Sequence, residues 1–138
     1  MREILFKAKR LDNGEWVEGS LLQTTAVSLK SFIVESACYT FDEWDWNECV
    51  EVDTNTICQY TGLTDKNGNK IWENDVVQYD FGKYAFGVQN AVVQYSLEHK
   101  GYIINPVGKW PCYLVEFDEV EVIGNIFDNP ELPKGGAE

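Results

Sequence analysis

The chain has 138 residues, 44% of them hydrophobic, and its 11 basic and 23 acidic side chains give a formal net charge of −12 at pH 7. This composition is too apolar for a disordered chain and is sufficient for a folded core. No apolar run approaches the roughly 20 residues that a membrane-spanning helix needs, and the N-terminus lacks the apolar stretch of a signal peptide. We therefore expect a soluble globular protein of the cytoplasm.

The acidic balance argues against two classes of partner. Nucleic acids and anionic membranes are bound through Lys and Arg, so we expect neither direct nucleic-acid binding nor membrane binding. Residues 35–53 hold seven carboxylates and no basic residue, and residues 116–138 hold seven carboxylates and only Lys134. Such stretches are typical of a solvated surface. The alternatives are a surface that docks on a basic partner and one that imitates DNA.

The N-terminal part of the chain is predicted to be β-rich. Apolar and polar residues alternate over residues 4–9, which is typical of a half-buried strand. Residues 12–14 (Asp-Asn-Gly) predict a hairpin turn, because Asn-Gly readily adopts positive φ angles. Residues 16–22 and 27–34 follow as further strands. We expect a β-rich N-terminal extension over residues 1–58.

The C-terminal half is predicted to be a small barrel. Its strongest turn signal is the polar stretch at residues 64–70, with Asn67-Gly68 at its centre. Short apolar runs, rich in β-branched and aromatic residues and bounded by Gly, Pro, Asn or Asp, lie on both sides of this turn. Closure into a barrel would remove the exposed edges of such strands. We expect this domain over residues 59–132 and a flexible tail at residues 133–138.

The cysteines and the single histidine predict no metal site and no catalytic thiol. There is no C-x-x-C pair, and His99 alone cannot complete the usual Cys/His zinc sets. A catalytic thiol would need a histidine beside it. We expect four reduced thiols packed in or near the core: Cys38, Cys49, Cys58 and Cys112.

Other motifs for chemistry are incomplete. Asp65 to Asn69 resembles the start of a calcium loop, but the glycine and glutamate that such a loop requires are Lys70 and Val76 here. A hairpin turn explains the stretch better than a weak cation site. His99 lies in a predicted exposed turn, and no glycine-rich phosphate loop is present. We therefore predict no catalytic residue, no cofactor and no metal, and a protein that is not an enzyme.

Among the five tryptophans, Trp44 and Trp46 are the best candidates for an interaction surface. They lie in an acidic and aromatic stretch, residues 41–48, where an extended chain would place both rings on one face. A structural role in the core is the alternative, and it is the default for Trp16 and Trp72, which adjoin predicted turns.

Three stretches, Arg2–Ala8, Gln59–Val77 and Val120–Leu132, resemble the YopX family of phage and prophage proteins. Asn74 stands where that family more often has glycine, and residues 27–51 match nothing in the resemblance. The resemblance implies a mainly β protein with an SH3-like barrel in its C-terminal half, encoded by a phage or prophage, and capable of self-association. It implies no activity, so it supplies no catalytic residues.

These observations support three hypotheses for the function. The first is a non-catalytic protein-interaction module whose partner is an unknown host or phage protein or a second copy of the chain. The second is an acidic DNA-mimic inhibitor of a host DNA-binding protein, which needs carboxylates arrayed at phosphate spacing. The third is a small hydrolase or carbohydrate-active enzyme, which needs a pocket holding two carboxylates.

Overall fold

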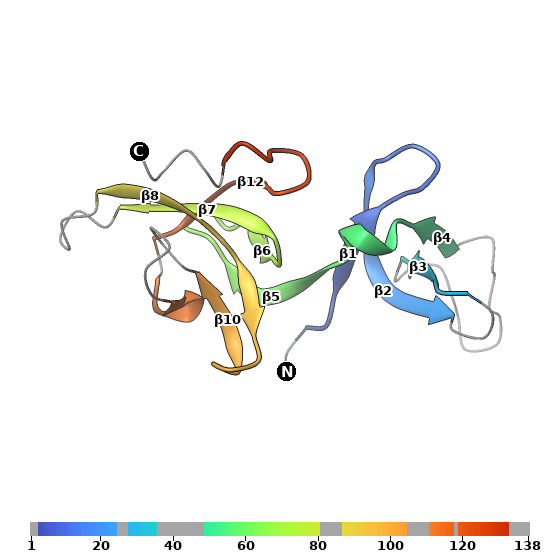
Figure 1. Cartoon of the computed structure of the whole chain (residues 1–138), viewed down its shortest axis with the longest axis horizontal. Coiled ribbons are helices and arrows are strands. Elements are labelled where there is room, and N and C mark those ends of the chain that lie inside the picture. The colour runs from blue at the N-terminus through green and yellow to red at the C-terminus, as the bar shows by residue number, and fades with distance from the viewer. Residues whose placement is uncertain are drawn as a thin grey trace. The chain divides into compact units, whose positions relative to one another are not determined.

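The computed structural model describes residues 3–24, 28–35, 49–80, 87–104, 111–117 and 119–132. The described chain is mainly β, as predicted, with strands joined by turns and short 3₁₀ segments (Figure 1). It divides into two compact units, Met1–Tyr60 and Thr61–Glu138. None of the helical segments in the described ranges has the length and apolar character that a bilayer crossing demands.

The first unit is an antiparallel meander in which each strand pairs with the next. Its strands are β1 (Phe6–Lys9), β2 (Trp16–Thr24), β3 (Lys30–Val34) and β4 (Cys49–Val52). The 3₁₀ segment η2 (Thr54–Thr56) then leads into β5 (Cys58–Thr64), whose first residues pair with β1. Alternate residues point inward and form the core of this unit: Ala8, Val17, Ile33 and Val52.

Backbone hydrogen bonds bring the chain beyond β1 onto β4. The N–H of Leu11 donates to the carbonyl of Glu51 at 3.1 Å, and the N–H of Asp53 donates to that of Lys9 at 2.8 Å. At Gly19 in β2, an added Cβ would collide with the backbone carbonyl of Val34. Glycine is therefore required at this position by the close approach of two strands.

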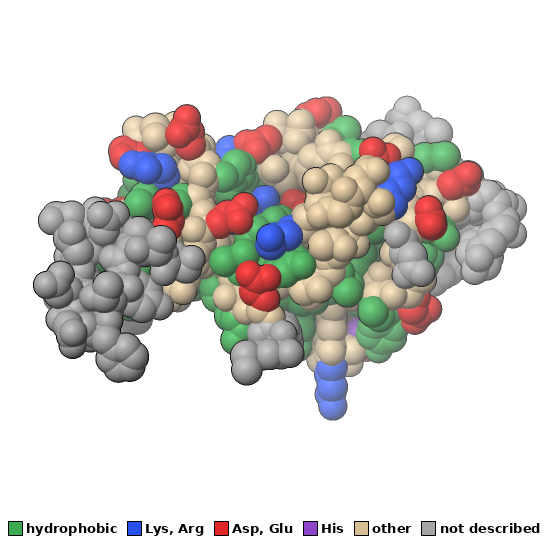
Figure 2. All heavy atoms as spheres, turned by 180° about the vertical axis from the view of Figure 1, so that it is seen from behind, with side chains coloured by type: hydrophobic (Ala, Val, Ile, Leu, Met, Phe, Trp, Pro, Cys, Tyr) green, Lys and Arg blue, Asp and Glu red, His purple; other side chains and the backbone are tan. Residues whose placement is uncertain are grey.

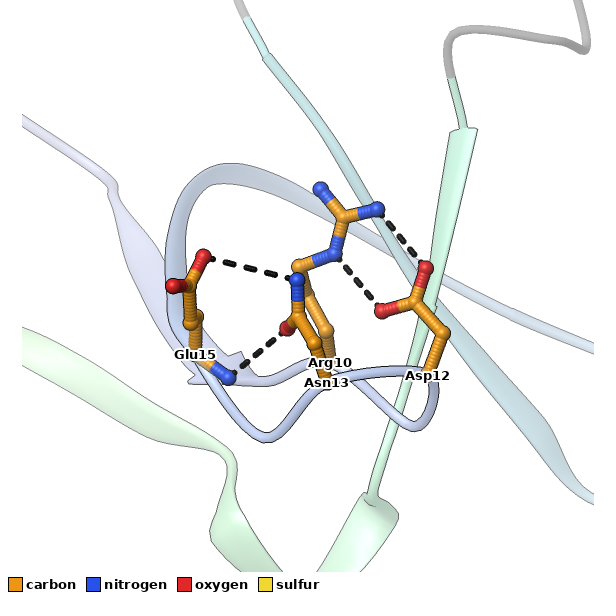
Figure 3. Close-up of polar contacts among 4 residues, drawn as sticks. All are labelled: Arg10, Asp12, Asn13 and Glu15. Atoms are coloured by element: carbon orange, nitrogen blue, oxygen red, sulfur yellow. Dashed lines mark hydrogen bonds and ion pairs between the residues drawn. The ribbon is translucent and has the colours of Figure 1, made fainter.

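The predicted turn between β1 and β2 is confirmed, and it contains an Arg10–Asp12 pair (Figure 3). Gly14 has a φ of 74°, as the Asn-Gly signal implied. The guanidinium of Arg10 donates to both carboxylate oxygens of Asp12 at 2.9 and 2.8 Å. This hydrogen-bonded pair raises the pKa of Arg10 and lowers that of Asp12, because each charge favours its partner's charged form. The side chain of Arg10 is 33% exposed and that of Asp12 is 65% exposed, so the pair orders the turn more than it stabilises the unit.

The second unit contains two three-stranded antiparallel sheets, and its β6 lies next to β5. In one sheet β7 is central between β12 and β8, and in the other β10 is central between β9 and β11. The strands are β6 (Lys70–Trp72), β7 (Asp75–Asp80), β8 (Val88–Val92), β9 (Gln94–Ser96), β10 (Gly101–Ile104), β11 (Cys112–Tyr113) and β12 (Glu121–Asn125), with the 3₁₀ segment η5 (Leu114–Glu116) after β11. The core of this unit comprises Ile71, Val77, Ala91, Val93, Ile104, Leu114 and Val120.

The SH3-like barrel expected over residues 59–132 is not confirmed, because none of the described sheets closes into a barrel. Strands β8 and β9 are separated by a single residue, Val93, at which the chain changes sheets. The N–H of Val93 donates to the carbonyl of Asp75 at 2.9 Å, and its carbonyl accepts the N–H of Asn74 at 2.8 Å. One residue later, Gln94 pairs with Ile103 of β10. The chain therefore leaves the β7 sheet for the β10 sheet at this residue.

Candidate functional site

The residues singled out for interaction, Trp44 and Trp46, lie outside the described residues, so their role stays a prediction. Most of the acidic stretch at residues 35–53 also lies outside them. Of its carboxylates, the structure describes Glu35, which is exposed, and Glu51 and Asp53, which are half-buried. Elsewhere on the face shown in Figure 2, acidic side chains are spread in separate places, with basic side chains between some of them.

The calcium-like stretch forms a turn organised by a buried carboxylate. Asp65 is only 5% exposed. One of its oxygens accepts the N–H groups of Asn67 and Asn69, both at 2.9 Å, and the other accepts the N–H of Val122 at 3.0 Å. These bonds close the turn between β5 and β6 and tie it to β12. The hairpin-turn interpretation of this stretch is therefore confirmed.

The electrostatics of Asp65 fit a structural role. Burial alone would raise the pKa of this carboxyl group, but the N–H donors of Val122, Asn69 and Asn67 outweigh burial and hold the pKa below its ordinary value. Both oxygens are already occupied by donors from the protein. Within the described ranges, no group of three or more His, Cys, Asp or Glu side chains is placed to hold a metal ion.

The structure brings His99 next to a serine, in the turn that joins β9 to β10. The hydroxyl oxygen of Ser96 lies 2.9 Å from Nδ1 of His99 and accepts the backbone N–H of the same residue at 3.1 Å. The hydroxyl of Tyr113 donates to the carbonyl of His99 at 3.1 Å. Lys100 completes the turn with a φ of 56°. The predicted turn at His99 is confirmed, but His99 itself is half-buried and not exposed as expected. The Ser-x-x-His spacing was the overlooked signal for its partner.

A serine beside a histidine raises the question of nucleophilic chemistry. A serine nucleophile needs a base that is oriented by a third group, and donors for a developing oxyanion. In the part of the chain that the structure describes, no hydrogen bond joins the His99 ring to a carboxylate, and the Ser96 oxygen already accepts a backbone N–H. The arrangement holds the turn in one shape, which is the role that its geometry supports.

This hydrogen-bonded turn carries an exposed apolar side chain. Leu97 is the first residue of the turn and is 84% exposed. Tyr113 and Val115, on β11 and η5, are 40% and 65% exposed. The ring of Tyr113 lies edge-on to that of His99, with centroids 6.0 Å apart. Single exposed apolar residues are ordinary, but here Tyr95 and Tyr113 lie on strands of one small sheet and Leu97 lies in its turn. We call the turn residues 97–100 with their flanking strands β9 and β10 the apolar hairpin.

Comparisons with known proteins place the chain in a family and support its fold. A family model described as YopX protein matches residues 5–134. The crystal structure of protein EF1440 from Enterococcus faecalis is similar, with a TM-score of 0.56 and 24% sequence identity over 96% of this chain and 99% of that chain. At this identity the likeness shows the fold alone. No curated protein matches the sequence.

Proposed function

The chain belongs to the YopX family, whose model covers nearly all of it, and on that premise we propose that it is a non-catalytic protein-interaction module. We place its action in the cytoplasm of a bacterial host, on behalf of a phage or prophage. Its contact surface is the apolar hairpin. The partner is a host or phage protein with an apolar pocket that accepts the tip of this hairpin.

One observation carries this proposal: Leu97 is 84% exposed on a turn that side-chain hydrogen bonds hold in shape. An exposed leucine in water loses the free energy that burial would supply, about 1.5–3 kcal/mol for a complete side chain. A turn already held in its bound shape loses little conformational entropy on binding. A few residues that fill a partner's pockets contribute most to binding at protein interfaces. Tyrosine is among the types enriched there, and Tyr113 lies beside this turn.

The surroundings of Leu97 fit an interface. Tyr113 is an exposed aromatic side chain with a polar tip, a type that is enriched at protein interfaces. Glu98 and Lys100 flank the tip with charges of both signs, as expected for a polar rim around an apolar anchor.

The experiment is site-specific photo-crosslinking in host cells. A photoreactive amino acid at position 97 of the full chain is expected to give a defined adduct with one partner. The matched control is position 29, since Leu29 is also an exposed leucine, 53% exposed, and lies in the other unit. An adduct of twice the chain's mass would identify a second copy as the partner. Adducts that are equally frequent at both positions, or absent from both, would overturn the proposal.

The two alternatives have less support than the interaction module. A DNA mimic needs one continuous array of carboxylates, whereas the acids visible in Figure 2 are spread in separate places. A hydrolase with paired carboxylates needs a pocket that holds two of them, and Asp80, Glu119 and Glu121 line one cavity of about 430 Å³ beside β7. The Ser96–His99 pair lacks an orienting acid among the described residues. Turnover of a glycoside abolished by Glu119→Gln or Glu121→Gln, or turnover of an ester abolished by Ser96→Ala, would make the purified chain a hydrolase.

A further inference from the structure

The sheet formed by β12, β7 and β8 buries side chains on both of its faces. Val77 and Ala91 point to the core of the second unit. Val76 precedes Val77 in β7, so its side chain points to the opposite, outer face. Val76 is nevertheless 0% exposed, although it is not among the described residues that form that core. The outer face is therefore covered at Val76.

The chain's own C-terminal segment lies on the outer face beside this residue. The register places Val76 opposite Gly124 of β12. A Cβ added at Gly124 would collide with the side chains of Leu132 and Asn129. The absence of a side chain at Gly124 thus leaves the space that Leu132 enters. We call residues 126–132, which follow β12 and turn back over the sheet, the C-terminal cap (Figure 1).

Two amide side chains of the sheet hold the backbone of the C-terminal cap. Gln78 lies opposite Asn90 and shares the outer face with Val76, because alternate residues of a strand point to the same side. The amide of Gln78 donates to the oxygen of Asn90 at 3.1 Å, and the amide of Asn90 donates to the backbone carbonyl of Leu132 at 3.2 Å. The outer face therefore offers space for an aliphatic side chain and a donor for the carbonyl of the same residue.

The C-terminal cap is held less firmly than the strands beneath it. It forms turns and no strand, Pro130 and Glu131 are exposed, and Leu132 is only half-buried. The N–H of Leu132 donates to the carbonyl of Asn129, and the N–H of Asn129 donates to that of Asn125, so both bonds stay within the local turn. Segments with few buried contacts open at a lower free energy than core strands. The cap can therefore leave the sheet while the sheet stays folded.

We infer that this outer face is a docking site for an extended, leucine-bearing segment of a partner protein, and that the C-terminal cap occupies the site in the free chain. The chemistry of the partner segment follows from the segment that already lies there. Its leucine replaces Leu132 beside Gly124, and the carbonyl of that leucine accepts the amide of Asn90. This site is separate from the apolar hairpin, and the inference does not depend on that hairpin's function.

Competition between the C-terminal cap and the partner makes the site self-limiting. The partner binds only those chains in which the cap is open, so the apparent affinity is the intrinsic affinity multiplied by the open fraction. Any change that weakens the contact of Leu132 with the sheet should therefore strengthen binding of the partner, provided that Gly124 and Asn90 are intact. This opposite effect on the cap and on the partner distinguishes a docking site from ordinary packing of a chain end.

The test is an NMR titration of the isotope-labelled full chain with a peptide of residues 125–132, amidated at its C-terminus so that the carbonyl of its leucine is kept. We expect the largest shifts at the backbone amides of Val76 and Gly124 and at the side-chain amide of Asn90. At saturation, the amide signal of the chain's own Leu132 should also shift, because the peptide displaces the cap. The same peptide with a serine in place of its leucine should cause none of these shifts.

Variants of the full chain test the competition. Leu132→Ser should raise the affinity for the peptide about fivefold, the change expected when a partly buried leucine no longer competes. The matched control Leu29→Ser changes a leucine that is 53% exposed in the first unit, and it should leave the affinity unchanged. Asn90→Asp, added to Leu132→Ser, keeps the shape of the side chain but removes its N–H donor. This double variant should bind the peptide more weakly than Leu132→Ser alone.

Three outcomes would overturn the inference. The first is equal affinity of the wild-type chain and the Leu132→Ser variant, which would show that the cap does not compete. The second is the absence of shifts at Gly124 and Asn90 in both chains. The third is equal binding of the serine-containing peptide, which would show that the leucine is not recognised. If Leu132→Ser does not fold, the wild-type titration decides, and an unshifted Leu132 signal at saturation would refute the displacement.

Discussion

The carboxylate of Asp65 accepts the backbone N–H of Val122 at 3.0 Å, across 57 residues of chain. Beside it, the N–H of Lys66 donates to the carbonyl of Val120 at 3.0 Å. These two bonds fasten the turn between β5 and β6 to the start of β12. They join the beginning of the second unit to its end, and the stability of this unit should therefore be unusually sensitive to Asp65.

Replacing Asp65 by Asn should destabilise the second unit by about 2–3 kcal/mol, the cost expected when buried donors lose a charged acceptor. An amide keeps one acceptor oxygen but directs N–H donors toward the N–H of Val122 or of Asn69. Urea denaturation followed by tryptophan fluorescence would measure the change. The control Glu131→Gln alters an exposed acid and should shift the stability by less than about 0.5 kcal/mol. A loss in the Asp65→Asn variant no larger than in this control would show that the carboxylate is dispensable.

The same carboxylate should make stability depend on acid pH. The pKa of Asp65 is lower in the folded chain than its ordinary value, so folding favours the charged form. Its contribution is fully present above the unfolded-state pKa, about 3.9, and is lost as the pH falls through the folded-state pKa. The stability difference between wild type and Asp65→Asn should therefore shrink below about pH 4. A difference that stays constant down to the acid limit of folding would contradict this assignment.

Gly19→Ala should be strongly destabilising, by about 2–3 kcal/mol, because the added methyl group meets the backbone carbonyl of Val34, and a backbone cannot move aside as a side chain can. Gly101→Ala is the matched control in a strand. There the nearest atoms belong to the ring of Tyr113 at 3.8 Å, an ordinary contact distance. Thermal unfolding of both variants should separate them clearly, and similar melting temperatures would show that β2 and β3 can move apart.

Ser96→Ala should loosen the turn of the apolar hairpin without unfolding the unit. The N–H of His99 loses its acceptor and His99 Nδ1 loses its partner, at a cost of about 1 kcal/mol. Amide hydrogen exchange at His99 should accelerate, while exchange at buried Ile104 in β10 stays slow. Crosslinking from position 97 should become weaker in this variant, because the tip is then less well ordered before binding. Unchanged exchange at His99 would show that the backbone alone holds the turn.

The features predicted correctly from the sequence are those that depend on the conformational preferences of neighbouring residues. The Asn-Gly pairs at residues 13–14 and 67–68 predict turns because of their φ preferences, and both glycines have positive φ angles. Alternating residues predict the mainly β class, because a strand has a period of two. Family membership followed from three stretches of sequence. The number of sheets did not follow, because the chain changes sheets at Val93, where no Gly or Pro marks a break in the sequence.

The candidate sites were only partly foreseeable. His99 was placed in a turn, but the exposed apolar tip beside it was not singled out, since Leu97 in sequence looks like any strand residue. Trp44 and Trp46 remain predicted interaction residues. The cavity beside β7 was not foreseen, because its lining comes from separate strands and turns that only the fold brings together.

Composition, alternation and turn residues thus determined by themselves that this is an acidic, mainly β chain, and the resemblance of three stretches of sequence indicated the YopX family. Only the tertiary structure decided that Asp65 accepts the N–H of Val122 and that the carbonyl of Val34 leaves no space for a side chain at Gly19. It also decided that acids from separate elements line one cavity. The physical reason is the sequence distance over which each effect acts. Backbone preferences act over a few residues, whereas these contacts depend on which strands lie side by side. Many strand registers satisfy the same local pattern, so the local pattern does not select one of them.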